Sequence, residues 1–341
     1  MVTKYIGADV HVATTDLAVE RNGKILQWYH VPTSVPALRE VLAGVASPKV
    51  LVMEEGAMAG WLKRNLDTDV GRVIVCDPRR NALIAKDGDK SDPIDAAKLA
   101  TLAAGGYVRE VYHSDDEARV ELKEWVALYH DRRQEAVRQI NKIHAVARGR
   151  GVLVPSRARS EPGRSEWVRG IPAVLWRQLS LVFPAYDLAQ DLADRALRRV
   201  RQLSRDYEVI ARWQEVPGIG PVRSATLLAY LDTPWRFRTA AKLCKYCGVG
   251  LERRSSGTDR RGRPKPPALH LAWRVNKRLK DAVMGATVTA LGGDNPFREK
   301  YRRLLCDGLT PGNARHTVAR RLLAVLWGMW KTNTSYRPEW V

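Results

Sequence analysis

Hydrophobic and polar residues alternate through three successive segments near the N-terminus: KYIGADVHV, TTDLAVE and KILQWYHV. A period of two residues places one face of a segment in the core and predicts a β-strand. Between the second and third segments, Arg21-Asn22-Gly23 supplies the Asn-Gly pair that is typical of a tight hairpin turn. Residues 3–31 are therefore expected to form three consecutive antiparallel strands.

The pattern then changes to helices that alternate with buried strands. A helix is expected from Val35 to about Val45, followed by an apolar strand, KVLVM, that ends at Glu54. A short helix near Trp61 precedes a second apolar strand, RVIVC, and Ser91-Asp92-Pro93 opens a helix over DPIDAAKLATLAA. Antiparallel strands followed by alternating helices and strands predict an α/β, ribonuclease-H-like fold over residues 1–114.

Two long, charged helical segments follow, at 115–150 and about 186–213, and they flank a less regular stretch with several Pro and Gly residues, 151–183. Two such helices predict an antiparallel helical arm or coiled coil over residues 115–214, with that stretch as an insertion. An ordinary helical bundle is an equal alternative, because no heptad pattern runs far enough to decide.

The segment VPGIGPVRSATLLAYL opens a third region, 215–341, which is helical and basic. Gly218 and Gly220 form the Gly-x-Gly turn of a helix-hairpin-helix, in which the free amides of the second helix can meet a phosphate. A plain turn between two helices is the alternative.

The net charge of the chain is the feature of its composition that most narrows the possible functions. A chain of 341 residues with 45% hydrophobic content is long enough for two or three domains. Its formal net charge is +20 and its pI is near 10.1. Such an excess favours a polyanionic partner, because each phosphate that Lys or Arg neutralises releases condensed counterions. A soluble basic protein without such a partner is the alternative.

Four cysteines are too few for a disulfide framework in a chain of this length. Cys244 and Cys247 form a C-x-x-C in an apolar helical stretch, where packing is the favoured interpretation and a zinc or redox site is the alternative. The N-terminus does not resemble a signal peptide, and no uncharged apolar run reaches the roughly 20 residues of a membrane span. A cytoplasmic location is expected.

Four carboxylates fall where strands and a helix would aim them at one point. Asp9 lies near the end of the first strand, and Glu54 ends the next parallel strand, so both project from the same sheet edge. Glu55, which faces the opposite way, is the alternative to Glu54. Asp92 and Asp95 share one side of a helix, although capping and the helix dipole explain the same pair. Clustered carboxylates hold two Mg²⁺ ions in phosphodiester chemistry.

Ser256 lies within a long run of basic residues, although Ser255-Ser256-Gly257 alone is typical of a flexible loop. A basic cluster can bind a scissile phosphate and stabilise the charge that develops on it, and a serine there is a candidate nucleophile. His270 is the nearest histidine, and it is not assigned as a base. The basic residues are Arg253, Arg254, Arg260, Arg261, Arg263, Lys265, Arg274, Lys277, Arg278 and Lys280.

With these motifs in place, the chain resembles the insertion-sequence transposases of the family numbered one hundred and ten, which are DEDD recombinases. IGADVH resembles the family's first-Asp strand, VLVMEEGAMAGWL its Glu strand, and VIVCDPRRNALIAKDGDKSDPIDAAKLA its Pro-Arg-Arg loop and Asp-x-x-Asp helix. VPGIGPVRSATLLAYLDTPWRFRTAAKLCKYCGVG resembles the opening of its C-terminal domain, NPFREKY and ARHTVARRLLAVLWGMW its closing part, and RRSSG its Ser-Gly element, which places Ser256 at the nucleophile.

The chain departs from the family pattern in three places. Glu55 stands where a small residue is usual, Leu251 replaces the usual proline before the serine, and RGRPKPPALHLAW replaces a Thr-Lys-x-Gly-Asn segment. The contacts that the replaced segment makes in the family are therefore not expected here.

The resemblance implies a RuvC-like domain joined by a coiled-coil arm to the domain that carries the serine. It implies that Asp9, Glu54, Asp92 and Asp95 hold Mg²⁺ while Ser256 becomes transiently linked to DNA as phosphoserine. It further implies composite active sites in a homo-oligomer, from dimer to tetramer, and a non-coding RNA of the element that pairs with donor and target DNA. Strand exchange would then proceed through a Holliday-junction-like intermediate.

Three functions follow from these patterns. The first is an RNA-guided transposase or recombinase in which Arg79, Arg80 and the basic run around Ser256 contact phosphates. The second is a metal-dependent Holliday-junction-type nuclease in which water attacks, so that Asp9 is essential and Ser256 is not. The third is a non-catalytic nucleic-acid-binding protein, which would bind in a salt-dependent way and leave DNA intact.

Overall fold

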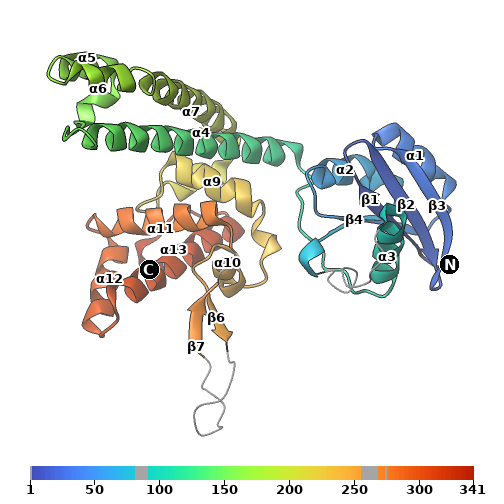
Figure 1. The fold of residues 1–341 in the computed structure, drawn as a ribbon. Coiled ribbons are helices and arrows are strands. Elements are labelled where there is room, and N and C mark those ends of the chain that lie inside the picture. The colour runs from blue at the N-terminus through green and yellow to red at the C-terminus, as the bar shows by residue number, and fades with distance from the viewer. Residues whose placement is uncertain (1, 81–90, 255–267, 273–274) are drawn as a thin grey trace, which may run out of the picture. The chain divides into compact units, whose positions relative to one another are not determined.

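The structure, a computed structural model, describes residues 2–80, 91–254, 268–272 and 275–341 (Figure 1). It divides into two compact units, Met1–Asp116 and Glu117–Val341. The boundary falls close to the one that the sequence predicts at residue 114. Each unit is described by itself below.

A five-stranded sheet forms the centre of the first unit, in the order β3-β2-β1-β4-β5. β1 pairs antiparallel with β2 and β2 with β3, whereas β1, β4 and β5 run parallel to one another. Asn22 and Gly23 have positive φ, as the predicted Asn-Gly hairpin turn requires. The predicted strand arrangement is thus confirmed. The strands are β1 (Lys4–Val10), β2 (Thr14–Arg21), β3 (Lys24–Pro32), β4 (Lys49–Glu54) and β5 (Arg72–Cys76).

Helices cover both faces of this sheet. On one face, α1 (Val35–Gly44) and α2 (Ala59–Leu66) bury leucines against Ile6 and Met53, because alternate strand residues point to the same side. On the other face, α3 (Asp92–Ala104) packs Leu99 and Ala103 against Val52 and Ile74. The mixed α/β arrangement agrees with the ribonuclease-H-like prediction. Two short 3₁₀ helices, η1 (Asp67–Asp69) and η2 (Pro78–Arg80), complete the unit.

The second unit begins with a pair of antiparallel helices, α4 (Glu117–Arg148) and α7 (Phe183–Ser204) (Figure 1). Their direction follows from two contacts: Glu121 near the start of α4 forms an ion pair with Arg199 near the end of α7, at 2.6 Å between Oε1 and Nη2. Arg133 donates a hydrogen bond to Gln190 halfway along, at 2.8 Å. The antiparallel arm is therefore present, and its coiled-coil character stays a prediction.

Two details of this region differ from the prediction. The stretch 151–183 is more regular than expected, because it contains η3 (Ser156–Arg159), α5 (Glu161–Val168) and α6 (Ala173–Leu179), whose Trp167, Leu175 and Leu179 are buried. The predicted helix at 186–213 is interrupted, because α7 ends at Ser204 and Tyr207, with an extended backbone, is the N-cap of a separate helix, α8 (Glu208–Trp213).

An ion pair of the buried Arg164 holds the far end of the arm together, and it gives a first prediction. Both terminal guanidinium nitrogens of Arg164 lie 2.6 Å from the carboxylate oxygens of the half-exposed Asp187, and the guanidinium lies 4.0 Å from the centre of the Phe183 ring. We expect Asp187→Ala to lower the free energy of unfolding by about 1–2 kcal/mol, because the buried guanidinium loses its bidentate partner and keeps only the exposed Glu161 carboxylate, 3.3 Å away. Urea unfolding of the full chain measures this change.

Asp191→Ala is the matched control for that experiment. Asp191 pairs with Arg195 one turn away on α7, but both side chains are more than half exposed, so their pair contributes little. Equal destabilisation by the two substitutions would show that burial of Arg164 has no part in the stability of the arm.

The remaining helices share one core with the near end of the arm. Leu122, Val126 and Val200 from α4 and α7 pack in the same cluster as residues of the C-terminal helices. The sequence division at residue 214 therefore crosses a continuous core, and the third domain stays a prediction. The elements are α9 (Pro221–Leu231), η4 (Pro234–Arg236), α10 (Ala240–Tyr246), β6 (Leu251–Arg254), β7 (Ala268–Leu271), α11 (Lys277–Leu291), α12 (Pro296–Cys306), α13 (Pro311–Thr332) and η5 (Pro338–Trp340).

The pair β6 and β7 corrects the expectation that everything after residue 215 is helical. The two strands pair antiparallel, with Leu251 opposite Leu271. Each strand has only four residues, so neither is long enough for a two-residue period to be recognised in the sequence.

Candidate metal and nucleic-acid site

The β1 strand and the α3 helix lie unusually close to each other at Gly7. A Cβ atom added there would lie 2.0 Å from the carbonyl oxygen of Ala96 and 2.6 Å from the amide nitrogen of Ala100. A glycine inside a strand is typical of such a close backbone approach. Because side chains alternate along a strand, Asp9, two residues after Gly7, lies on the same face, toward α3. Gly7 is a functional position that the sequence reasoning missed.

Asp9, His11 and Asp92 form the cluster at this junction. The Nε2 atom of His11 lies 3.2 Å from Oδ2 of Asp9 and 3.4 Å from Oδ2 of Asp92. Among the described residues, these three form the group whose potential ligand atoms all lie within 4.8 Å of one another. Glu54 and Asp95 are outside that group. The sequence correctly predicted that Asp9 and Asp92 lie close together. It did not single out His11, although this residue follows Asp9 by two positions, a spacing that places both on the same face.

The electrostatics of this cluster suit a cation. Partial burial raises the pKa of Asp9, and the neighbouring charges of Asp92 and Asp95 raise it further, whereas His11 lowers it. A carboxylate that is half-buried among like charges is costly unless a proton or a cation accompanies it. The arrangement therefore fits a divalent metal ion bound by carboxylate oxygens.

The register of β4 bears on the choice between Glu54 and Glu55. Val52 packs against α3 in the core, so Glu54, two residues later on the same strand, lies on the face of Asp9. Glu55 instead directs its carboxylate to His113, at 2.6 Å between Oε2 and Nε2. The structure thus favours Glu54, although it does not bring this carboxylate into the group of Asp9, His11 and Asp92.

The start of α3 also differs in detail from the expected capping. Ser91, not Asp92, is the N-cap residue, and its side chain accepts no capping hydrogen bond. Asp92 and Pro93 are the first residues of the helix, and Asp95 donates its backbone N–H to the Ser91 carbonyl at 3.0 Å. Both acids lie in the first turn, where the helix dipole favours negative charge. This stabilisation is compatible with a role of the same acids in metal binding.

Part of the basic run predicted to contact phosphates lies outside the described residues, and so does the predicted nucleophile Ser256. The basic residues concerned are Arg260, Arg261, Arg263, Lys265 and Arg274. Only the backbone is described for Arg80, in η2, and for Arg253 and Arg254, in β6. Arg79 is exposed and contacts Asp77, at 3.0 Å between Nε and Oδ1. One member of the sequence-defined basic run is engaged inside the unit, because Arg278 binds both the Tyr230 hydroxyl and the Asp131 carboxylate.

The two glycines of the predicted hairpin have different surroundings. Gly218 has a φ of +88°, and a Cβ atom there would lie 2.1 Å from the Ala286 carbonyl oxygen, so α11 packs directly on its backbone. Its own carbonyl accepts a hydrogen bond from Arg223 at 2.7 Å. Gly220 is the N-cap of α9 and has open space around it. Helix packing accounts for Gly218, and phosphate binding at this turn stays a prediction.

The C-x-x-C cysteines contribute to the core of the second unit. Cys244 and Cys247 are buried and free. Burial raises the pKa of both thiols, to about 11 for Cys244. Thiols that are held protonated at neutral pH are poor metal ligands and nucleophiles. The structure thus agrees with the packing interpretation.

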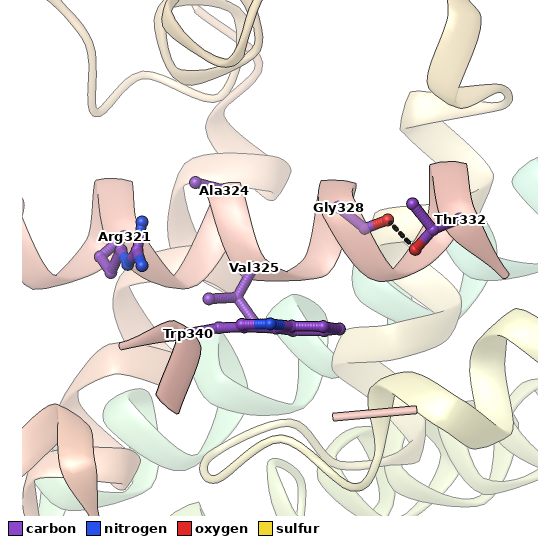
Figure 2. A pocket seen from close by; sticks show the side chains of 6 residues that line it. All are labelled: Arg321, Ala324, Val325, Gly328, Thr332 and Trp340. Atoms are coloured by element: carbon purple, nitrogen blue, oxygen red, sulfur yellow. Dashed lines mark hydrogen bonds between the residues drawn. The ribbon is translucent and has the colours of Figure 1, made fainter. Parts of the chain in front are cut away.

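A groove of about 280 Å³ runs along α13 (Figure 2). Figure 2 shows the Trp340 indole lying beneath the helix, with Val325 pointing toward it, and Thr332 bound to the Gly328 carbonyl. None of the residues that line this groove is an acid, a histidine or a cysteine. The residues that line it are Arg321, Ala324, Val325, Gly328, Thr332 and Trp340.

Comparisons with known proteins add independent findings. The pattern of a family described as DEDD transposase of the IS110 type matches residues 6–149, and that of the Transposase IS116/IS110/IS902 family matches residues 211–302. A relative from Streptomyces clavuligerus, the "Insertion element IS116 uncharacterized 44.8 kDa protein", is 28% identical over 145 residues. The match covers 42% of this chain and 34% of that protein, about a third of the relative's length. In the described part of the chain, none of the helices is long and apolar enough to cross a membrane.

Proposed function

Because the chain belongs to the IS116/IS110/IS902 family of transposases, we propose that it cuts and joins DNA strands at the ends of an insertion sequence. One observation carries this proposal. Asp9 near the end of the central strand, with a raised pKa, lies close to Asp92 in the first turn of α3, inside the region that matches the DEDD pattern. Two elements that are distant in sequence thus build one acidic centre.

The residues of this centre fit a divalent metal. Asp9, Glu54, Asp92 and Asp95 would hold it, and Mg²⁺ is the proposed ion because it prefers carboxylate oxygens. When bound, the metal would neutralise charge on the phosphate oxygens. The like charges around Asp9 supply the electrostatic reason for such an ion.

Ser256 is the proposed nucleophile. Its Oγ would form a bond to the scissile phosphorus while the bond from phosphorus to the sugar oxygen breaks, and the departing oxygen would take up a proton. The covalent link conserves the phosphodiester bond energy, so that a second DNA hydroxyl can reverse the step on another strand. Basic residues of the run Arg253–Lys265 would stabilise the charge on the phosphate.

The proposed partners are donor and target DNA, with a non-coding RNA of the element as the guide. A net charge of +20 supports binding of both polyanions. Active sites shared between protomers of a homo-oligomer, from dimer to tetramer, are part of the same proposal, because the acidic centre and the serine belong to different units of the chain.

The acidic centre by itself also suits a second function, a metal-dependent junction nuclease in which water attacks. The observation that favours it is the described cluster itself, because the ligand atoms of Asp9, His11 and Asp92 lie within 4.8 Å of one another and could hold a metal ion that activates water. In this function, Ser256 is dispensable and no covalent intermediate forms.

Ser256→Ala separates the two functions. We expect at least about a 10³-fold loss of the joined ends that remain after excision of the element, since a nucleophile cannot be replaced by a methyl group. Quantitative amplification across the joined ends, in cells that carry the gene with its native flanking DNA, measures this loss. Ser255→Ala is the matched control and should retain most of the activity. Unchanged excision in soluble Ser256→Ala protein would exclude the serine and favour the water-using nuclease.

A further inference from the structure

His11 occupies the centre of the acidic cluster, although neither the four-carboxylate pattern nor the family comparison assigns it a role. We propose that its Nε2 atom is a third protein ligand of the divalent ion, next to Asp9 and Asp92, and that it shifts the preference of the site from Mg²⁺ toward Mn²⁺. The inference rests on the proposed function, because it presupposes that the cluster binds metal.

The spacing of the three side chains is the first argument. Adjacent ligands of an octahedral ion with bonds of about 2.1 Å lie about 3 Å from one another. The Nε2 atom of His11 lies 3.2 Å from the Asp9 oxygen and 3.4 Å from the Asp92 oxygen. Both separations are close to that ligand spacing, and small side-chain movements would suffice to place one ion within reach of all three.

His11 differs from the other histidines that contact acids in the described part of the chain. His30 contacts Asp16, its direct cross-strand neighbour, and His113 contacts Glu55. Each of these rings reaches one carboxylate. His11 reaches two, which come from β1 and from α3. This arrangement offers a metal ion carboxylate oxygens from two separate elements together with an imidazole nitrogen, which are ligand types that proteins use for divalent metals.

The chemistry of the ligand then gives the metal preference. Mg²⁺ is a hard ion that favours oxygen ligands, whereas imidazole nitrogen suits transition metals. A site with carboxylates alone has little reason to distinguish Mg²⁺ from Mn²⁺ by ligand type. One imidazole ligand adds affinity for Mn²⁺ relative to Mg²⁺, as it does for the other first-row transition metals. The His11 side chain is 52% exposed, so the ring is accessible to an ion from solvent and its loss should leave the fold intact.

Mn²⁺ binding to the full chain tests the proposal without any measurement of catalysis. Electron paramagnetic resonance measures the concentration of free Mn²⁺ during a titration and so gives the affinity. Electron spin echo modulation detects a ¹⁴N nucleus that is directly coordinated to bound Mn²⁺. We expect the wild type to show the ¹⁴N signal, and His11→Ala to lose it while its Mn²⁺ affinity falls at least about tenfold. Competition of Mg²⁺ against bound Mn²⁺ should show that His11→Ala lowers the affinity for Mg²⁺ much less than the affinity for Mn²⁺.

His30→Ala is the matched control, because it removes another histidine that pairs with an acid of the same sheet. It should retain both the ¹⁴N signal and the affinity. Bound Mn²⁺ without a ¹⁴N signal in the wild type, or a signal that survives in His11→Ala, would overturn the ligand role and leave His11 as an ion-pair partner. If the wild type binds no Mn²⁺, or binds it equally well after Asp9→Asn, the metal site itself is overturned, and with it the proposed function.

Discussion

Asp9→Asn should reduce excision of the element by about 10³-fold or more while leaving the protein folded. An amide cannot supply the negative charge that would hold the proposed divalent ion at a phosphate, where the ion would stabilise the developing charge. Quantitative amplification across the joined ends measures the loss, with the soluble protein level as a check. Asp67→Asn, which changes an exposed acid in η1, is the control and should behave like the wild type. Full excision by Asp9→Asn would remove the acidic centre from the mechanism.

The same variant should be at least as stable as the wild type in metal-free buffer. Burial and the like charges raise the pKa of Asp9 in the folded chain above the ordinary value of 3.8. Its charged form therefore costs folding free energy at every pH above that raised pKa, and Asn removes the cost. The difference should vanish below pH 3.8, where Asp9 is protonated in folded and unfolded chains alike. Thermal unfolding at pH 7 and pH 3 tests the sign.

Gly7→Ala should impair both stability and activity. The added methyl group would overlap backbone atoms of Ala96 and Ala100, which cannot rotate away as a side chain does. We expect the free energy of unfolding of the first unit to fall by about 3 kcal/mol. Because α3 carries Asp92 and Asp95, a helix displaced by about 1 Å should also lower activity by about 10²-fold. Urea unfolding and the excision assay measure the two effects.

Gly44→Ala is the matched control for that substitution. Gly44 ends α1, and a Cβ atom there would meet no other atom within 4 Å. It should leave both stability and excision near the wild-type values. A harmless Gly7→Ala would mean that α3 does not approach β1 as closely as the structure shows.

The sequence was informative where periodicity is strong and chemistry is local. The alternation over residues 3–31 and the apolar runs before Glu54 and Asp77 predicted the five strands, because one or both faces of each strand are buried. Asp9 and Asp92 lie close together as predicted, because the end of a strand and the start of the helix that packs on it can adopt few relative positions.

The parts that were missed depend on contacts between distant segments. Gly7 is required because the backbone of α3 lies too close for a Cβ atom. The proposed role of His11 depends on its proximity to Asp92, which is distant in the sequence. The strand β7 pairs with β6 although neither is long enough to show a pattern. Ser256 remains an inference from its neighbours in sequence, because it lies outside the described residues.

The most direct test of the account is to map the covalent link between protein and DNA. Purified wild-type protein would be incubated with the proposed guide RNA and a nicked DNA end of the element. The mixture would then be denatured, digested with protease and nuclease, and analysed by mass spectrometry. The account predicts a nucleotide phosphate on Ser256, formed with a divalent metal and lost with chelator or Asp9→Asn. Cleaved DNA with no modified peptide, or with the nucleotide on another residue, would contradict it.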